Sequence, residues 1–446
     1  MTDTNIFSFF DDILAATKKR GADSTELLYS KSVNQSEHVR MGKAEETERA
    51  EEAVLGIKIR QGKKEAAITC NDKTMAAVAP LLDKLFAMVT VLPDNPFAGE
   101  ADPAQLFKGK APDLEAFDPT ELTAAQLQEL ARAVEDAARG EQYITNSEGA
   151  NASFGKNQHW FAFSNGFRGQ EYHSHFSLGV SIIAGKGSDM ESDYDYSSKV
   201  FFEDLLKPEV IGKEAARRAV RALGGRQEKS GQLPVIIDKR IATSFIGNLA
   251  RAINGNSIAK GTSFLQGKLG EVIMNPAITI IDNPLRKRGF ASQSYDGEGL
   301  PTSQKSIVDK GVLTTYVLDL ATARQLKMTP TGHANRSLTG VYPSLTNVHM
   351  TNGQSSLADL MADIKEGLYI TRLMGFGVNG VTGDYSQGAS GFWIVNGELA
   401  HSVNEMTVAG NLKDIFMNLT PANDLEFIHH NNAPSLRIDG LTIAGK

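Results

Sequence analysis

The nine histidines and the single cysteine are the side chains of this sequence best suited to bind a transition metal. None of the histidines is followed by glutamate, so the sequence contains neither an HExxH nor an HExxxH zinc motif. Cys70 is the only cysteine, which excludes a zinc site that needs two or more thiolates. It lies in the strand-like run AAITCND without a neighbouring basic cluster, and we expect a packed residue rather than a nucleophile.

Two pairs of histidines remain as candidates for a metal site or a cleft. His173 and His175 are two residues apart in an expected strand, so both lie on one face and could supply two ligands. The sequence suggests no third ligand nearby, and a half-exposed pair on a strand explains the same spacing. His429 and His430 would point to opposite sides of a strand, and we interpret them as structural or cleft-lining residues.

A glycine-rich segment from Gly375 to Gly391 includes a literal GxGxxG match at residues 375–380. A dinucleotide-binding loop requires a helix directly after this motif, but the following VTGDYSQGASGFW has no helical periodicity. Neither a P-loop nor a GxSxG nucleophile elbow occurs in the chain. The glycines either form tight connections in a sheet or line a groove where an extended peptide could pair, and the sequence favours neither.

Composition places the chain among ordinary globular proteins. Its 446 residues suggest two or three domains, and a hydrophobic fraction of 41% allows sizeable cores. The net charge of −7 includes no long basic block, so we expect no nucleic acid as a partner. No stretch approaches about 18 apolar residues, and Met1 to Phe10 does not read as a signal peptide. Together with the lone cysteine, these features predict a cytoplasmic protein without a membrane span.

Two related helix-plus-sheet units, residues 1–112 and 113–228, are expected in the N-terminal half. In the first, hydrophobic periodicity predicts helices over residues 5–20 and 74–89 with strands between them, before a Pro- and Gly-rich linker. In the second, helices are expected from Asp118, as an N-cap, and over residues 208–223. The runs Leu55-Gly56-Ile57 and Leu178-Gly179-Val180 occupy matching places in the two units, which favours a duplication.

Residues 229–446 are expected to form a third unit, a sheet-rich, barrel-like domain, which makes the whole chain an α+β protein. A strand at PVIIDK precedes a helix over residues 241–254. Short strand-like runs with glycine turns follow, and Asn396-Gly397 between two of them predicts a tight hairpin. Two further helices are expected over residues 356–366 and 411–419.

Several of these motifs together resemble the TldD/PmbA family, whose older name is modulators of DNA gyrase. The resemblance covers essentially the whole chain. It is carried in the C-terminal half by SYDGEG at 294–299, TGHA at 331–334, MGFG at 374–377, TGDYSQGASGFW at 382–393, VNGE at 395–398 and AGNLKD at 409–414. In the N-terminal half it is carried by VRMGK at 39–43 and LGI at 55–57.

Within this family the sequence is most similar to the PmbA branch, also called TldE. The TldD branch resembles a zinc protease with an HExxxH helix and a distant cysteine ligand. In the same register this chain has Ile246 and Gly247 at the first histidine and the glutamate, and Arg251 at the second histidine. No cysteine follows Cys70, so the third ligand is missing too. The resemblance therefore implies no metal in this chain and zinc in a TldD-like partner.

The resemblance implies a heterodimer in which this chain helps to enclose a cleft. The family degrades unfolded peptides and trims the leaders of some antibacterial peptides. We expect His333, Asp384, Tyr385 and Asn411 to line that cleft, and no residue of this chain to be catalytic. A regulatory or scaffold protein without peptide turnover is the alternative, and a hydrolase with its own metal at His173 and His175 is a third. The isolated chain could also form a homodimer.

Overall fold

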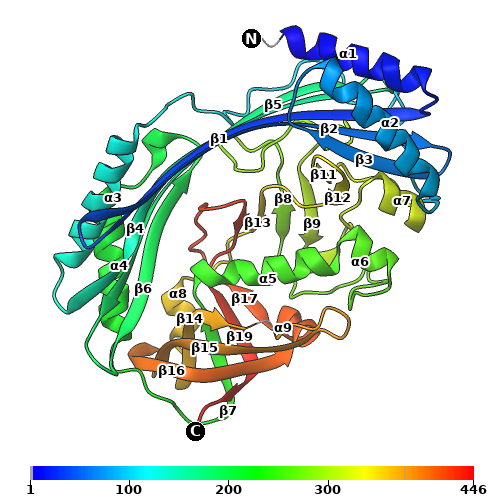
Figure 1. Ribbon diagram of the computed structural model, residues 1–446. Helices are drawn as coiled ribbons and strands as arrows, with labels where there is room; N and C mark the ends of the chain where they lie inside the picture. Colours follow the sequence, from blue (N-terminus) through cyan, green and yellow to red (C-terminus); the bar gives the residue numbers. More distant parts are fainter. Residues whose placement is uncertain (1–3, 376) are drawn as a thin grey trace.

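The computed structural model describes residues 4–375 and 377–446; Met1–Asp3 and Phe376, the second residue of the GxGxxG match, lie outside the described residues. The expected α+β class is confirmed. A long curved sheet from the N-terminal half bends around a C-terminal part that contains a closed barrel (Figure 1). No helix among the described residues is long and apolar enough to cross a membrane.

The N-terminal half forms one continuous six-stranded sheet with the order β3-β2-β1-β4-β5-β6. Its strands are β1 (Ser24–Arg40), β2 (Lys43–Gln61), β3 (Lys64–Cys70), β4 (Ile144–Phe163), β5 (Arg168–Ala184) and β6 (Glu191–Lys199). The two expected units meet where β1 and β4 pair antiparallel, from Glu26 opposite Phe163 to Val39 opposite Ala150. The unit boundary in the sequence therefore does not interrupt the sheet.

The two halves of this sheet repeat one order of elements, as expected of related units. Helix α1 (Thr4–Lys19), three strands and α2 (Met75–Val91) are followed by α3 (Ala124–Arg139), three strands and α4 (Pro208–Ala222). Strands β2 and β5, which carry the two similar LGI and LGV runs, flank the central pair on opposite sides. The helices cover the outer side of the curved sheet (Figure 1).

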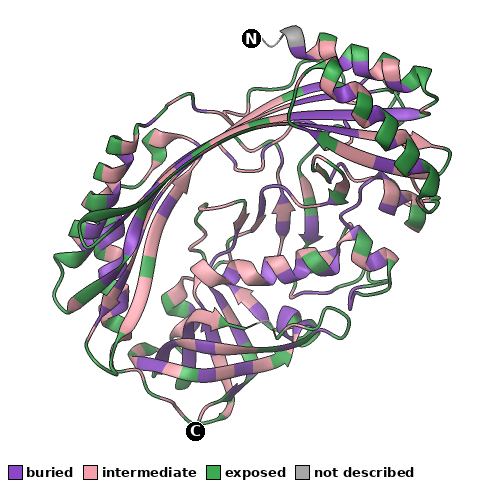
Figure 2. Ribbon diagram, in the orientation of Figure 1, coloured by how far each residue is buried: buried purple, intermediate pink, exposed green. Residues whose placement is uncertain are grey.

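Each half of the sheet has its own apolar core beneath its helices. Phe10, Leu27 and Leu82 belong to the core under α1 and α2, and Val134 and Phe176 to the core under α3 and α4. Buried and less buried residues alternate most regularly along β5 (Figure 2), where nearly every second residue is buried. This alternation is what a sheet with one strongly apolar face requires.

The turn between β1 and β2 explains the VRMGK motif. Met41 and Gly42 have positive φ angles of 51° and 76°, a conformation that a two-residue hairpin turn needs. Their backbone N–H groups donate to the two carboxylate oxygens of Glu135, each at 2.7 Å. Glu135 is fully buried on α3, so the motif joins the first unit to the helix of the second.

Helix α3 begins later than the sequence predicts. Thr123, not Asp118, is its N-cap, and Thr123 and Gln126 form a capping box. Asp118 instead accepts hydrogen bonds from the backbone N–H groups of Thr120 and Phe202, at 2.8 and 2.9 Å. The Asp118 side chain, which local sequence predicts to cap the helix, therefore makes a long-range contact with Phe202 instead.

The C-terminal part contains a five-stranded closed barrel. Strands β16-β15-β14-β7-β19 are neighbours in that order, and β16 also pairs with β19, which closes the ring. Its strands are β7 (Gly231–Ile237), β14 (Glu366–Met374), β15 (Asp384–Val395), β16 (Glu398–Asn411) and β19 (Leu436–Ala444), with β17 (Leu419–Pro421) added at one edge. The expected hairpin is present, with Asn396 and Gly397 at φ angles of 49° and 84°.

A second sheet and several helices complete this part. The sheet has the order β10-β9-β8-β13-β18. Its strands are β8 (Ile280–Asp282), β9 (Lys305–Asp309), β10 (Val312–Leu313), β13 (Val348–Met350) and β18 (Asn431–Asn432), and β11 (Ala334–Arg336) pairs with β12 (Val341–Pro343). The helices are η1 (Phe202–Asp204), in the N-terminal half, and α5 (Lys239–Ala252), α6 (Gly255–Ala259), α7 (Leu320–Leu326), α8 (Leu357–Met361) and α9 (Leu412–Met417). Helix α5 shares one apolar core with the barrel and the second sheet.

The linker after α2 returns to the sheet through Glu100, and this contact predicts a pH effect. Ser164 donates its N–H and hydroxyl to the Glu100 carboxylate at 3.1 and 2.9 Å. Burial, and then the charge of Glu26, raise the pKa of Glu100 to about 7. The folded chain thus holds this proton more tightly than the unfolded chain. The resulting stability is complete below about pH 4.5 and is lost as pH rises through about 7.

We therefore expect the free energy of unfolding of Glu100→Gln, relative to that of the parent chain, to increase by about 1–2 kcal/mol as the pH rises from 5 to 8. This value is discounted for the partial exposure of Glu100. Urea unfolding of both proteins at the two pH values measures this difference. Because both share every other titrating group, the difference isolates Glu100. An equal offset at both pH values would contradict the raised pKa.

Candidate functional site

Helix α5 borders a cavity at the place where the resemblance puts the zinc helix. Asp238 caps the helix by accepting from the N–H of Arg240 at 2.9 Å, and the apolar stripe of the helix is buried in the core. Asn248 and Arg251 line a cavity of about 380 Å³, and Arg251 Nη2 donates to Asn248 Oδ1 at 2.5 Å. Gly375, Gly380 and Gln387 also line this cavity.

The residues at the implied ligand positions of α5 do not fit a zinc ion. Ile246 is fully buried in the core, Gly247 has no side chain to offer, and Arg251 brings a permanent positive charge and only hydrogen-bond donors. No group of three or more His, Cys, Asp and Glu residues is placed to hold a metal within residues 4–375 and 377–446. Cys70 lies buried on β3, in the N-terminal sheet, with Sγ 3.2 Å from the carbonyl oxygen of Asp72.

The glycine-rich segment serves close backbone packing at two of its positions. A Cβ on Gly377 would lie 1.6 Å from the Ser386 carbonyl oxygen, and one on Gly391 would lie 1.9 Å from that of Tyr369. The Ser386 N–H donates to Gly377 O at 2.7 Å, so the segment folds back on the start of β15. At Gly380, by contrast, a Cβ would make only an ordinary contact at 3.8 Å. Tight connection thus explains Gly377 and Gly391, whereas Gly380 leaves room at the cavity.

Asp384 and Asn411 face one another across β15 and β16. They are direct partners in the strand register, and Asn411 Nδ2 donates to Asp384 Oδ1 at 3.1 Å. Thr382 Oγ1 donates to the other carboxylate oxygen at 2.5 Å, and these two hydrogen bonds, Thr382 first, lower the pKa of Asp384. Asn411 also accepts from the Lys413 N–H and so caps α9. The exposed Asp384 therefore lies anionic in an open depression next to the α5 cavity.

Tyr385, the next residue, points into the protein. Its side chain is buried and its ring stacks on Phe245 of α5 at 5.9 Å between centroids. Its hydroxyl has no hydrogen-bond partner among the described residues, and burial raises the pKa of that hydroxyl. Tyr385, the residue next to Asp384 in the chain, thus packs the barrel against α5.

His333 lies apart, in a buried polar network. Its Nδ1 lies 2.8 Å from Thr331 Oγ1 and its Nε2 lies 3.1 Å from Asp282 Oδ2. His333 is 2% exposed and Asp282 is fully buried, so neither reaches solvent in this conformation. Asp282 also accepts from the N–H and hydroxyl of Thr346. The structure therefore brings Asp384, Tyr385 and Asn411 together and places His333 in a support for the second sheet.

A larger cleft of about 860 Å³ lies between β6 and α4 on one side and α5 and residues 426–433 on the other. Tyr194, Tyr196 and His429 form a stacked aromatic row in it, with centroid distances of 6.0 and 5.3 Å, and the Tyr196 hydroxyl is hydrogen-bonded to His429 Nε2. His429 is thus placed in a cleft, and the carbonyl of His430 accepts from Val348 of the second sheet. His173 contacts Glu171 at 3.9 Å on β5.

Sequence reasoning missed the two tyrosines of this row. Their spacing of two residues on an expected strand places them on one face, which is the only signal that the sequence offers. Nothing local connects them to His429, which lies 233 residues from Tyr196 along the chain.

Comparison with known proteins gives matches along almost the whole chain. Residues 117–223 match the family model described as PmbA/TldA metallopeptidase central domain, and residues 230–445 match the corresponding C-terminal domain. The chain is 33% identical to Metalloprotease PmbA of Escherichia coli O157:H7, over 95% of this chain and 93% of the relative. It is 32% identical to the Metalloprotease PmbA homolog of Haemophilus influenzae, over 96% and 93%.

Solved structures show the same fold. A crystal structure described as a modulator of DNA gyrase, from Bacteroides thetaiotaomicron, matches with a TM-score of 0.92 and 28% identity, over the full length of both chains. TldE from Thermococcus kodakarensis matches with a TM-score of 0.88 over 98% of this chain and 100% of that chain. Its identity is 20%, so this second likeness concerns the fold alone.

Proposed function

The chain belongs to the PmbA/TldD metallopeptidase family, and on that premise we propose that it is the PmbA/TldE-type subunit of a two-chain peptidase. A TldD-like partner holds the zinc ion, and this chain contributes walls of a cytoplasmic cleft that receives unfolded peptides or leader peptides. Zinc, when bound by the partner, activates the water that cleaves the peptide bond. The residues of this chain bind and position the peptide.

The α5 cavity is the observation that carries this proposal. In the register that the resemblance implies, Arg251 stands where a ligand histidine would be, and its guanidinium donates to Asn248. A zinc hydrolase needs ligands and a base for its water, and neither Ile246, Gly247 nor Arg251 supplies one. A helix at this position without the residues that bind zinc is what we expect of a subunit that shapes a cleft.

The candidate residues take different parts in this proposal. Asp384 and Asn411 form a polar pair on the cleft wall beside the α5 cavity, and the hydrogen bond between them fixes their side chains. Tyr385 and His333 are buried, so we assign them the positioning of that wall and of the second sheet rather than contact with peptide.

Zinc content and peptide cleavage test the proposal. We expect the purified chain alone to bind no stoichiometric zinc and to leave an unstructured peptide intact. We expect a mixture with the TldD-like partner to form a complex, contain zinc and cleave the peptide. Atomic absorption, size-exclusion chromatography and a fluorescent peptide assay provide the three measurements.

Each other outcome has a defined meaning. Stoichiometric zinc and cleavage by the chain alone would refute the proposal and require ligands among its histidines. A zinc-loaded complex that turns over no peptide would support the regulatory alternative. The partner alone serves as the matched control, because full activity without this chain would also contradict a cleft shared by two subunits.

A further inference from the structure

Exposed apolar side chains gather in the cleft of about 860 Å³ between β6, α4, α5 and residues 426–433, which we call the aromatic cleft. It is lined by Tyr194, Leu206, Val210 and Phe427, which are 44%, 46%, 51% and 39% exposed. Single exposed apolar residues are ordinary, but several that share one concave site mark a ligand-binding groove or an interface. The volume of the cleft also lies within the range of ligand sites, about 300–1,000 Å³.

Packing within the chain does not account for these four side chains. None of them belongs to a hydrophobic core in the described part of the chain. Val210 illustrates the difference, because the next residue, Ile211, is fully buried in the core under α4. The N–H of Leu206 donates to Ser197 Oγ of β6 at 3.1 Å, which fixes the chain at the start of α4 while the Leu206 side chain stays exposed.

Neighbouring residues hold the aromatic rings of the cleft in place. Tyr196 stacks on both Tyr194 and His429, at 6.0 and 5.3 Å between centroids. The Arg286 guanidinium lies over the Phe427 ring, 3.5 Å from its centroid. Rings that are fixed before a ligand arrives lose little conformational freedom when it binds, so more of the interaction energy is available for affinity.

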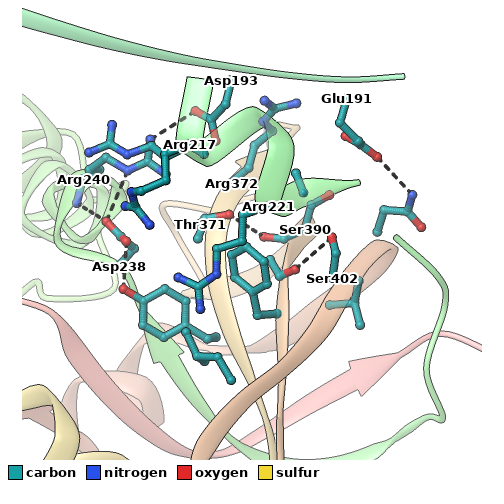
Figure 3. A pocket seen from close by; sticks show the side chains of 18 of the residues that line it. Glu191, Asp193, Arg217, Arg221, Asp238, Arg240, Thr371, Arg372, Ser390 and Ser402 are labelled. Carbon is teal, nitrogen blue, oxygen red and sulfur yellow. Dashed lines mark hydrogen bonds and ion pairs between the residues drawn. The ribbon is translucent and has the colours of Figure 1, made fainter. Parts of the chain in front are cut away.

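The neighbouring cavity, of about 230 Å³, is lined by five arginines: Arg217, Arg218, Arg221, Arg240 and Arg372 (Figure 3). They face five carboxylates, those of Glu191, Asp193 and Asp238 in its lining and of Asp195 and Glu214 beside it. Arg240, which lines this cavity and the aromatic cleft, pairs with Asp193 at 3.2 Å and with Asp238 at 3.4 Å. This cavity therefore has no excess of positive charge, and the arginines that it shares with the aromatic cleft are already paired.

Two lysines are the unpaired cations of the aromatic cleft. Every carboxylate of its lining already has an arginine or lysine partner, and these carboxylates are Asp195, Glu214, Asp238 and Glu426. Lys199 and Lys213 also line the cleft and have no carboxylate partner among the residues that the structure describes. An acidic group of a bound ligand would therefore meet these two lysines without breaking an existing ion pair.

We propose that the aromatic cleft binds a large apolar or aromatic side chain of an unfolded peptide, with a neighbouring acidic residue of that peptide beside Lys199 and Lys213. The inference rests on the proposed function, because it takes the ligand to be a peptide. Helix α5 borders both sites, the aromatic cleft with residues 239–243 and the cavity of the proposed function with residues 248–252. The two sites have no lining residue in common, so the cleft is a separate site for the same peptide.

Peptide binding to the purified full chain tests this and needs neither zinc nor the partner. Unstructured, C-terminally amidated decapeptides with one common fluorescent label carry Phe or Asn at the centre, next to Glu or Gln, and otherwise only Gly and Ser. We expect fluorescence anisotropy to show that Phe binds about tenfold or more tightly than Asn, because one aromatic side chain is buried. We expect Glu to bind about two- to threefold more tightly than Gln at low salt, the size of an exposed ion pair.

Variants of exposed residues assign these preferences to the cleft. Val210→Asn should remove most of the preference for Phe, because it places a polar group on the apolar wall. Val272→Asn is the matched control, since Val272 is 54% exposed, close to the 51% of Val210, and lies outside the cleft. The double variant Lys199→Gln with Lys213→Gln should lose the preference for Glu and keep that for Phe.

Equal binding of the Phe and Asn peptides, or an unchanged preference for Phe in folded Val210→Asn, would overturn the proposal. Equal binding of the Glu and Gln peptides would overturn the part assigned to the two lysines. N-acetyl-phenylalanine amide should compete at least about tenfold more weakly than the Phe–Glu peptide, since it lacks the acidic and backbone contacts; equal competition would overturn the peptide assignment in favour of a small aromatic molecule. Phe-selective binding by a chain whose partnered complex cleaves no peptide would leave this site intact and refute only the proposed function.

Discussion

Replacing Arg336 with alanine is expected to lower the free energy of unfolding by about 3–5 kcal/mol, the cost of leaving one member of a buried ion pair alone. Arg336 Nη2 lies 2.6 Å from Glu26 Oε2, and their side chains are 6% and 9% exposed. The Arg336 guanidinium also lies over the Phe163 ring at 4.5 Å and donates to Gly297 O. This single side chain thus ties the second half of the molecule to strands β1 and β4.

The charge of Glu26 explains the size of the expected effect. Burial raises the pKa of Glu26, but attraction to Arg336 and then Lys58 outweighs burial and holds the pKa below its ordinary value. Without Arg336, Lys58 at 3.8 Å is the remaining cation within ion-pair distance of the carboxylate, and Arg324 attracts it more weakly. We expect the double variant Arg336→Ala with Glu26→Gln to recover part of the loss, because it removes the unpaired charge as well.

Urea unfolding measures this effect against a surface pair. Arg20→Ala breaks the pair with Asp83, whose side chains are 34% and 72% exposed, and should cost less than about 1 kcal/mol. If Arg336→Ala cost no more than Arg20→Ala, the pair would not hold the two parts of the molecule together.

Gly391→Ala is expected to destabilise the barrel by about 2–4 kcal/mol, as backbone overpacking in a core does. The added Cβ would lie 1.9 Å from the carbonyl oxygen of Tyr369 and 3.0 Å from the Cα of Ile370. Gly391 is paired with Ile370 on β14 and with Val403 on β16, so the strands on both sides restrict its movement. Relief of the overlap requires β14 and β15 to separate.

Gly380→Ala is the matched control within the same glycine-rich segment. Its Cβ would meet only the Thr262 carbonyl oxygen at 3.8 Å, and we expect a change within about 0.5 kcal/mol in either direction. Urea unfolding of the two variants compares a glycine required by packing with one that borders a cavity. Similar stabilities for both would show that β15 can shift to accept the methyl group.

Local sequence patterns predicted the hairpin and most of the long helices, because turn residues and apolar stripes act over a few neighbouring residues. The hairpin at Asn396-Gly397 is present because these residue types adopt positive φ at low cost. Helices α1, α2, α4 and α5 lie within two residues of the predicted ranges, since an apolar stripe must be buried wherever the helix packs. The predicted start of α3 at Asp118 was wrong, because Asp118 accepts a hydrogen bond from the N–H of Phe202. Hydrophobic periodicity does not encode such a long-range contact.

The sequence by itself determined which chemistry α5 lacks, because ligand identity is a property of residue type: Ile246, Gly247 and Arg251 cannot hold zinc in any conformation of their helix. Only the tertiary structure decided which residues share a cavity. Tyr196 meets His429, and Arg221 faces the barrel that carries Arg372, across separations that no local pattern spans. His333 looks like a site residue in the sequence and is buried in the structure, because burial depends on what the rest of the chain packs against it.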